Sequence, residues 1–134
     1  MDCLFCKIVK GEIPSAKIYE DDYVYAFLDI GPVNKGHTLV IPKQHYETFL
    51  DIPDDIVSKL AVALKKIADA VMKGVDADGF NIGMNNYEAA GQVVKHAHFH
   101  IMPRFRGDGL KLWPQGSYSD GEMEAVRQKI TKHL

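Results

Sequence analysis

Apolar residues follow two different spacings along the chain, and each spacing predicts one type of element. Five segments have the alternating pattern or the short apolar run that is typical of strands: 17–20, 23–29, 37–42, 80–85 and 93–103. Between Pro53 and Lys73 the apolar residues recur every three or four positions, which predicts one long amphipathic helix. Ser119 and Glu122 have the spacing of a capping box, so a short C-terminal helix is expected from there through Ile130. Strand runs separated from the helices predict an α+β fold with a mostly antiparallel sheet of about five strands.

The size and composition of the chain narrow the class of protein. Its 134 residues suit a single domain, residues 1–134, with a sizeable core. A net charge of -2 offers no general attraction to duplex nucleic acid or to an anionic membrane, so neither partner is expected. The first residues lack the pattern of a signal peptide, and no apolar run approaches about 18 residues. The sequence therefore predicts a cytoplasmic protein.

Three of the six histidines fall within the run His96-Ala97-His98-Phe99-His100. Side chains alternate between the two faces of a strand, so the three imidazoles are expected on one face and the apolar residues against the core. Imidazoles titrate near neutral pH and can act as nucleophiles, proton donors or metal ligands. This run is therefore the first candidate for a functional site.

The run from His96 to Met102 has the form His-φ-His-φ-His-φ-φ, where φ is apolar, and it resembles the signature of the histidine triad (HIT) superfamily of nucleotide hydrolases and transferases. Six further segments resemble the same family: Ile13-Pro14, 20–22, 27–30, 36–43, Gly91-Gln92 and Pro103-Arg104. The resemblance extends from about residue 3 to residue 106, and the tail with Trp113 is similar to the prokaryotic-type, Hint-like branch. It implies a homodimer whose subunits join their sheets edge to edge, with a cleft for a purine nucleotide of AMP or GMP type on each subunit.

The resemblance also implies a reaction at the α-phosphate of a nucleotide conjugate. The middle histidine, His98, would attack phosphorus and form a nucleotidyl-histidine intermediate that water then hydrolyses. His100 would donate a hydrogen bond to the phosphate, His96 completes the triad, and His37 resembles a supporting histidine of the same pocket. The implied substrates are nucleoside phosphoramidates, aminoacyl-adenylates or dinucleoside polyphosphates.

Further positions resemble the family's nucleotide-binding residues. Asp29 ends an apolar strand, and its carboxylate suits the two ribose hydroxyls; alternatively it caps the turn at Gly31. Asn85 and Gln92 resemble positions that donate to the phosphate. Four apolar positions resemble the wall that holds the base, although ordinary core packing is an alternative for them: Phe5, Ile8, Ile18 and Ile30.

Val93 departs from the family pattern, because many relatives have serine or threonine there. A hydroxyl at this position could donate to the phosphate or to the leaving group, and valine cannot. The loss of such a bond to a charged group costs on the order of 1.5–3 kcal/mol. The departure makes the rate of phosphoramidate turnover uncertain without removing the nucleophile.

Cys3 and Cys6 are too close together to staple a fold, and they supply half of a tetrahedral thiolate and imidazole site. The resemblance implies a structural zinc ion (Zn²⁺) with His45 and His96 as the other two ligands. The alternative is a pair of free cysteines, one of them buried as a small apolar residue.

Two other classes of function compete with the enzyme. The three alternating histidines could themselves hold a metal, or the domain could bind nucleotides with weak or absent chemistry. Metal content and nucleotide binding, measured on one preparation, would separate these classes.

Overall fold

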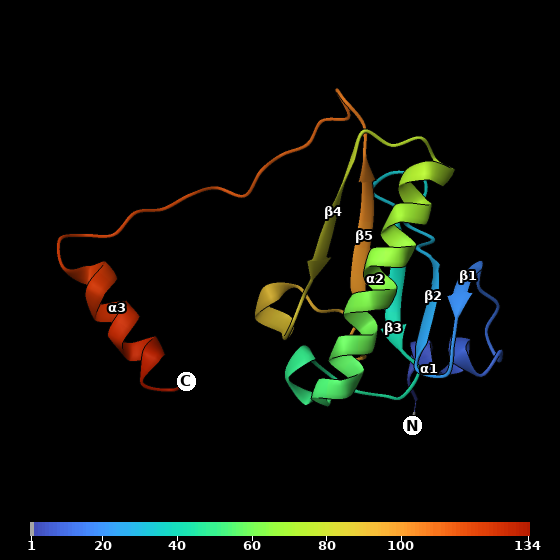
Figure 1. Ribbon diagram of the computed structural model, residues 1–134, viewed down its shortest axis with the longest axis horizontal. Helices are drawn as coiled ribbons and strands as arrows, with labels where there is room; N and C mark the ends of the chain where they lie inside the picture. Colours follow the sequence, from blue (N-terminus) through green and yellow to red (C-terminus); the bar gives the residue numbers. More distant parts are fainter. Residues whose placement is uncertain (1) are drawn as a thin grey trace.

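Five antiparallel strands form one sheet in the computed structural model, which describes residues 2–134 (Figure 1). The order across the sheet is β1-β2-β3-β5-β4. The bounds of the strands are β1 (Lys17–Glu20), β2 (Val24–Leu28), β3 (Thr38–Pro42), β4 (Gly79–Met84) and β5 (Phe99–Arg104). The predicted α+β class and the predicted sheet are confirmed.

Three α-helices accompany the sheet. The predicted long helix is α2 (Asp54–Gly74), and two helices lie near the ends of the chain, α1 (Leu4–Val9) and α3 (Glu122–Thr131). Short 3₁₀ turns cover η1 (Phe49–Asp51) and η2 (Glu88–Ala90). Sequence analysis missed α1, because six residues are too few to display a helical period. In residues 2–134 we find no helix with the length and apolar character that a membrane crossing needs.

The sheet is covered on both faces, which explains why all five residues of β3 are buried. On one face Val40 packs with the apolar side of α2 and with Ala97 and Ile101. On the other face Leu39 and Ile41 pack with α1. Figure 1 shows α2 lying across the sheet, with α1 behind the lower end of β2. The alternation along β3 thus divides its side chains between two cores.

The histidine segment differs from its prediction. Strand β5 begins at Phe99, so residues 93–98 form a loop and not the first half of a strand. The ladder with β3 ends at the pair Val40 and Phe99. Beyond it the Pro42 carbonyl accepts from the side chain of His96 (Nε2 to O, 2.9 Å) instead of from a backbone amide. A side chain thus takes the place of strand pairing and releases the preceding residues into a loop.

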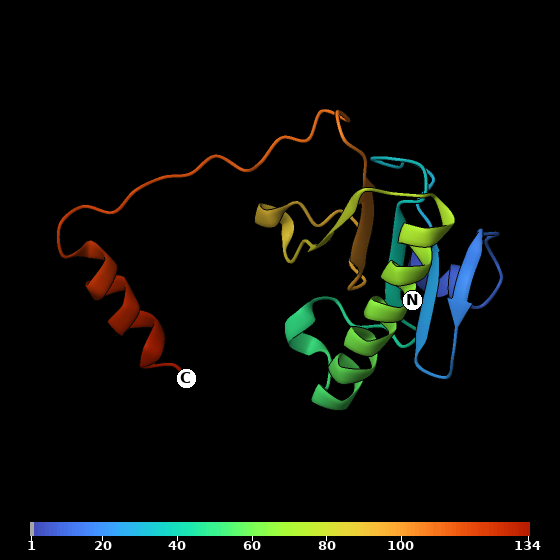
Figure 2. The same ribbon diagram turned by 45° about the horizontal axis from the view of Figure 1, so that its top comes forward.

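The C-terminal region forms an arm that leaves the sheet after β5 and carries α3 away from the body, as both ribbon views show (Figures 1 and 2). The capping box is only half formed. Ser119 N–H donates to the Glu122 carboxylate (3.0 Å), but the Ser119 side chain does not cap the helix, which begins after Gly121 with φ of 78°. Because α3 buries none of its residues, local hydrogen bonds alone decide where it begins.

Candidate functional site

A cleft of about 530 Å³ lies between α1 and the strand ends that carry the histidines. His98 and His100 form part of its lining, together with Asp29. The other lining residues are mostly apolar: Leu4, Phe5, Ile8, Ile13, Pro14, Ser15, Ala16, Phe27, Leu28, Ile30, Leu39 and Val94. An apolar cleft with a few converging polar groups is the usual form of a small-molecule site.

His98 has one committed nitrogen and one nitrogen with a lone pair. Its Nδ1 lies 2.7 Å from the carbonyl oxygen of His96. A carbonyl can only accept, so Nδ1 carries the proton and the lone pair of the neutral ring is on Nε2. The edge of the Phe5 ring packs against this imidazole (centroids 5.1 Å apart, planes at 89°). These contacts hold the buried His98 ring in one orientation at the wall of the cleft.

His37 and His100 form a second hydrogen-bonded pair whose tautomers are also set. Val33 N–H donates to His37 Nδ1 (3.0 Å), which leaves the proton of the neutral ring on Nε2. His37 Nε2 lies 2.9 Å from His100 Nδ1 and donates to it. The remaining proton of His100 is then on Nε2. His100 can therefore donate a hydrogen bond from Nε2 beside the His98 ring, since the centroids of the two rings lie 5.1 Å apart.

Burial keeps these imidazoles neutral. Burial, with a smaller contribution from the neighbouring His98 and His37 rings, lowers the pKa of His100 to about 4. Burial also lowers the pKa of His37, an effect that the Asp29 carboxylate partly offsets. At neutral pH both rings carry one proton each, which is the state that the hydrogen bonds require.

Asp29 lies at the mouth of the cleft, just after β2. Its Oδ1 accepts from Gly31 N–H (2.8 Å), the turn-capping contact that was the alternative to ribose binding. Its Oδ2 lies 3.6 Å from His37 Nε2, and the side chain is 23% exposed. Each carboxylate oxygen has two lone pairs, so the capping contact leaves acceptor sites open for hydroxyl groups.

Three of the four residues predicted to form the base wall line the cleft: Phe5, Ile8 and Ile30. The fourth, Ile18, does not. It lies on β1 beside a separate groove that it shares with the C-terminal part of α2. The pairing of β1 with β2 is irregular between Lys17 and Tyr19, and Ile18 lies at this irregularity, so its assignment to the wall is corrected.

Asn85, Gln92 and Val93 lie on the loop side of the histidine segment and do not line the cleft. Gln92 is buried and donates both amide protons to backbone carbonyls, those of Glu47 (2.6 Å) and Val94 (3.1 Å). No proton remains for a phosphate, so the expected role of Gln92 as a phosphate donor is corrected to holding the loop. Asn85 is exposed and makes a long contact with a backbone carbonyl (3.5 Å).

Val93 is 89% exposed and belongs to a different hollow, beside Cys3 and His45. A hydroxyl at this position would therefore face that hollow. The departure from the family pattern lies outside the histidine cleft.

Four predicted metal ligands come together at the N-terminus: Cys3, Cys6, His45 and His96. The sulfur-to-nitrogen separations are 3.4 Å for Cys3 and His96, 3.5 Å for Cys6 and His45, and 3.6 Å for Cys6 and His96. Tetrahedral zinc with ordinary Zn–S and Zn–N bonds places sulfur and nitrogen about 3.5 Å apart. The donor set and its spacing therefore fit a closed four-ligand zinc site.

The outer contacts of this cluster also suit a metal. His96 Nε2 donates to the Pro42 carbonyl, so its Nδ1 presents a lone pair toward the two sulfurs. Burial lowers the pKa of His96 to about 4, which keeps that lone pair free of a proton. Burial and the neighbouring Cys3 raise the pKa of the Cys6 thiol, a penalty on the thiolate that a bound cation would reverse.

A second group of possible ligands, Asp29, His37 and His100, lies within the cleft. Here the hydrogen bonds argue against a metal. His37 Nδ1 accepts from Val33, so Nε2, the atom that faces the other two residues, is protonated and has no lone pair to offer. His37 and His100 are hydrogen-bonded to each other, and Asp29 lies beside the pair.

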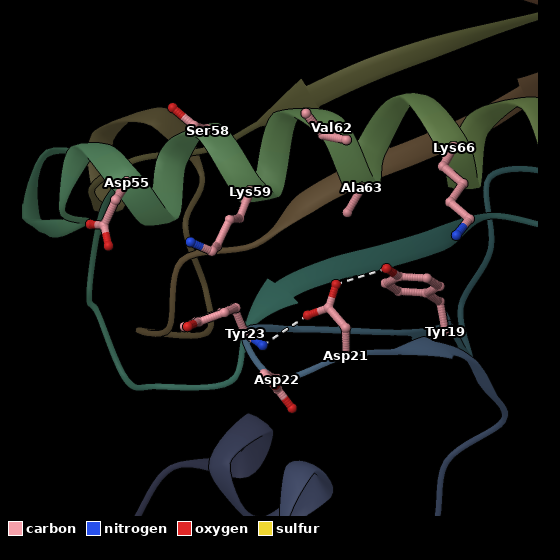
Figure 3. A pocket seen from close by; sticks show the side chains of 10 residues that line it. All are labelled: Tyr19, Asp21, Asp22, Tyr23, Asp55, Ser58, Lys59, Val62, Ala63 and Lys66. Carbon is pink, nitrogen blue, oxygen red and sulfur yellow. Dashed lines mark hydrogen bonds between the residues drawn. The ribbon is translucent and has the colours of Figure 1, made fainter.

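A hollow of about 760 Å³ lies between α2 and the turn from β1 to β2 (Figure 3). Figure 3 shows Lys59 extending toward Tyr23, and the Lys59 nitrogen lies 4.3 Å from the centre of that ring. Lys66 lies over the Tyr19 ring at 5.2 Å. The residues that line the hollow include neither histidine nor cysteine.

Gly36 precedes His37 and fixes the entry into β3. Its φ is 102°, and an added Cβ would lie 2.9 Å from Cγ1 of Val75 and 3.3 Å from Cγ of Pro103. We expect Gly36→Ala to lower the free energy of unfolding by about 1–3 kcal/mol, because strain and overlap add. Chemical denaturation measures this loss. Gly116→Ala, where an added Cβ meets nothing within 4 Å, should change stability by less than about 0.5 kcal/mol; equal losses would contradict the reason given.

Sequence analysis missed the backbone amide of Val33, which sets the tautomer of His37, and Asn34 beside it. A backbone donor has no side-chain pattern that could reveal it. It also missed Val94 and the apolar rim around Leu4, because α1 itself was not foreseen.

Comparisons with known proteins match this chain to one family. A family model described as HIT domain matches residues 10–107. An uncharacterized HIT-like protein of Methanocaldococcus jannaschii is 55% identical over 128 residues, which cover 96% of this chain and 98% of that protein. An adenosine 5′-monophosphoramidase of Schizosaccharomyces pombe is 38% identical over 136 residues, which cover 100% of this chain and 99% of that protein.

Solved structures give the same result. A HIT family protein from Bacillus subtilis has a TM-score of 0.92 and 43% identity, with 100% of this chain and 98% of that chain covered. A zinc-bound histidine triad family protein from Mycobacterium smegmatis has a TM-score of 0.79 and 38% identity, with 100% and 99% covered. A family model that matches most of the chain, and relatives aligned over nearly its whole length, establish that the chain belongs to the HIT domain family.

Proposed function

We propose that this protein hydrolyses purine nucleotide conjugates at the α-phosphate, with a nucleoside 5′-phosphoramidate as the preferred substrate class. The observation that carries the proposal is the set of hydrogen bonds around the two cleft histidines, from which we infer a lone pair on His98 Nε2 beside a proton on His100 Nε2. Relatives named adenosine 5′-monophosphoramidase support the choice of substrate class. Aminoacyl-adenylates and dinucleoside polyphosphates share the same reacting phosphate and are the alternative substrates.

Each residue has a task in this reaction. His98 Nε2 attacks phosphorus; the P–Nε2 bond forms as the P–N bond to the leaving amine breaks, and the departing amine takes a proton from a water molecule of the cleft. His100 donates from Nε2 to a phosphate oxygen, where negative charge grows. Water then attacks the nucleotidyl-histidine, and the products are a nucleoside monophosphate and free His98.

Mass spectrometry tests this proposal directly. Protein mixed with adenosine 5′-phosphoramidate and quenched in base, in which phosphohistidine bonds survive, should gain the mass of an adenylyl group, and peptide mapping should assign it to His98. A nucleotide that binds without an adduct and without product release would favour the binding-module reading and overturn the enzymatic proposal.

Asp29 is proposed to hold the ribose. We expect Asp29→Ala to weaken AMP binding by about 1.5–3 kcal/mol, the scale of hydrogen bonds to a charged group. Calorimetry with AMP and with its 2′,3′-dideoxy analogue measures the effect. The penalty should vanish for the analogue.

Asp29→Asn is the matched control, because the asparagine oxygen can still accept from Gly31 N–H while the charge is lost. An intermediate loss for Asp29→Asn supports the ribose role. Equal losses for AMP and the dideoxy analogue would show that Asp29 only shapes the turn.

We also propose that the cluster of Cys3, Cys6, His45 and His96 holds a structural zinc ion. The matching separations support it, and so does the zinc-bound relative. With all four positions taken by side chains, the ion would fasten α1 to the histidine segment and take no part in the reaction.

A homodimer is proposed through the open edge of β4, which has no neighbour on its outer side within residues 2–134. Phe80 and Ile82 on this strand are 43% and 47% exposed, and an exposed apolar edge strand is a template for pairing with another chain. Sedimentation should give twice the mass of one chain, and Ile82→Lys should give a single chain. A monomeric wild-type protein would contradict this proposal.

A further inference from the structure

Asp108 collects hydrogen bonds at the point where the C-terminal arm leaves β5. Arg104 donates to it with a two-pronged fork, Nε to Oδ2 at 2.9 Å and Nη2 to Oδ1 at 2.8 Å. The backbone amides of Phe105 and Leu110 donate to the same carboxylate at 2.9 and 3.1 Å. The Asp108 side chain is only 10% exposed, and hydrogen bonding with Arg104 holds its pKa far below the usual range. The carboxylate is therefore a fixed, charged acceptor at the end of the sheet.

Asn34 connects this acceptor to the loop before β3. Its Nδ2 donates to Asp108 Oδ2 at 2.8 Å and to the Pro103 carbonyl at 2.9 Å. Both protons of the amide are used, and both partners belong to β5 or to the turn that follows it. Because β5 also carries His100, Asn34 ties the loop to the strand of the catalytic pair.

The loop before β3, which Asn34 ties to β5, places one backbone N–H donor beside the site. Val33, next to Asn34, donates its N–H to His37 Nδ1, and His37 N–H donates back to the Asn34 carbonyl at 3.0 Å. The Val33 side chain is 52% exposed, so packing does little to hold this residue in place. The position of the Val33 amide therefore depends on the side chain of Asn34.

We propose that Asn34 and Asp108 are positioning residues that fix the tautomers of His37 and His100, and thereby keep the proton of His100 on the nitrogen that faces the substrate phosphate. This inference rests on the proposed function. The path runs from Asp108 through Asn34 to the Val33 amide, and from there through His37 Nδ1 and Nε2 to His100 Nδ1.

Loss of the Val33 donor would permit the opposite arrangement. His37 could carry its proton on Nδ1 and accept on Nε2, and His100 would then donate from Nδ1. The lone pair of His100 would lie on Nε2, where it repels a phosphate oxygen instead of binding it. The two neutral rings keep the same number of protons, so the change requires no titration.

Asn34→Ala removes the tie, and Asp108→Asn is a second variant that keeps the shape but loses the charged fork with Arg104. Lys35→Ala is the matched control, because Lys35 lies in the same loop, is exposed, and makes no hydrogen bond or ion pair within residues 2–134. The protein is labelled with ¹⁵N and used as purified. Imidazole ¹⁵N spectra report the tautomers of His37 and His100, and steady-state kinetics with adenosine 5′-phosphoramidate report kcat and KM.

We expect both variants to shift His37 toward the Nδ1–H tautomer and to lower kcat about tenfold or more, with a smaller change in KM, while Lys35→Ala resembles the wild type. Unchanged tautomers in both variants would overturn the inference, even if kcat falls. Absence of hydrolysis by the wild type would instead overturn the proposed function, and the spectra would still report whether Asn34 sets the tautomers.

Discussion

His98→Asn is expected to lower kcat for adenosine 5′-phosphoramidate by three or more orders of magnitude. The asparagine amide has no lone pair able to attack phosphorus, so covalent catalysis is lost. Its N–H can still donate to the His96 carbonyl, as His98 Nδ1 does, so the loop should keep its shape. AMP should therefore bind with nearly the wild-type affinity. Steady-state kinetics and calorimetry on one preparation measure both quantities.

His133→Asn is the matched control, because it is the same substitution at an exposed histidine near the end of the arm. It should leave kcat within about twofold of the wild type. Turnover by His98→Asn within tenfold of the wild type would assign the nucleophile to another residue, and His100 would be the first to test.

Removal of zinc is expected to have the second largest effect. Protein as purified should hold one zinc ion per chain, and a strong chelator should lower Tm by about 10 °C or more. A metal held with a free concentration of a hundred to a thousand times its Kd stabilises the folded state by roughly 3–4 kcal/mol, which corresponds to such a shift for a domain of this size. Elemental analysis and thermal unfolding, with and without added zinc, measure the result.

The effect should extend to nucleotide binding, because α1 lies between the two sites. Cys3 and Cys6 flank the helix start, and Phe5 and Ile8 on the same helix line the cleft. We expect Cys6→Ser to lose the metal and to raise KM while kcat stays close to the wild-type value, since His98 is untouched.

His45→Ala should also lose the metal, and His133→Ala should keep it. The opposite result would be zinc that is kept when both cysteines are replaced and lost in His98→Asn. That result would support the alternative in which the three histidines themselves bind the metal. If protein purified without chelators contains no metal, the proposed zinc site is contradicted.

The hydrophobic pattern by itself determined the fold class and the long helix. The predicted helix 53–73 and the observed α2 differ by one residue at each end, because an apolar stripe of three- and four-residue spacing has few alternatives to burial on a sheet. The alternation through Ala97, Phe99 and Ile101 also placed these residues in the core, as found. The spacing of apolar residues is sufficient to predict a helix or strand whose burial depends only on its own residues.

The sequence also indicated the residues that we propose to carry the chemistry, through the histidine run and its resemblance to the family. It could not determine which nitrogen of each ring holds a proton. That depends on acceptors and donors far away in the chain, such as the His37 ring for His100 and the Val33 amide for His37. The sequence shows which residues are histidines, but it does not show which groups form hydrogen bonds with them.

Tertiary structure also decided which residues share a site. Phe5 reaches the triad because α1 folds back under β2, whereas Ile18 lies beside another groove, at an irregularity in the pairing of β1 with β2. His96 leaves the expected strand because its side chain replaces a backbone donor at Pro42. Gln92 uses its amide protons on the loop that results. Each of these outcomes depends on contacts between distant segments, and such contacts form only when both faces of the sheet are covered.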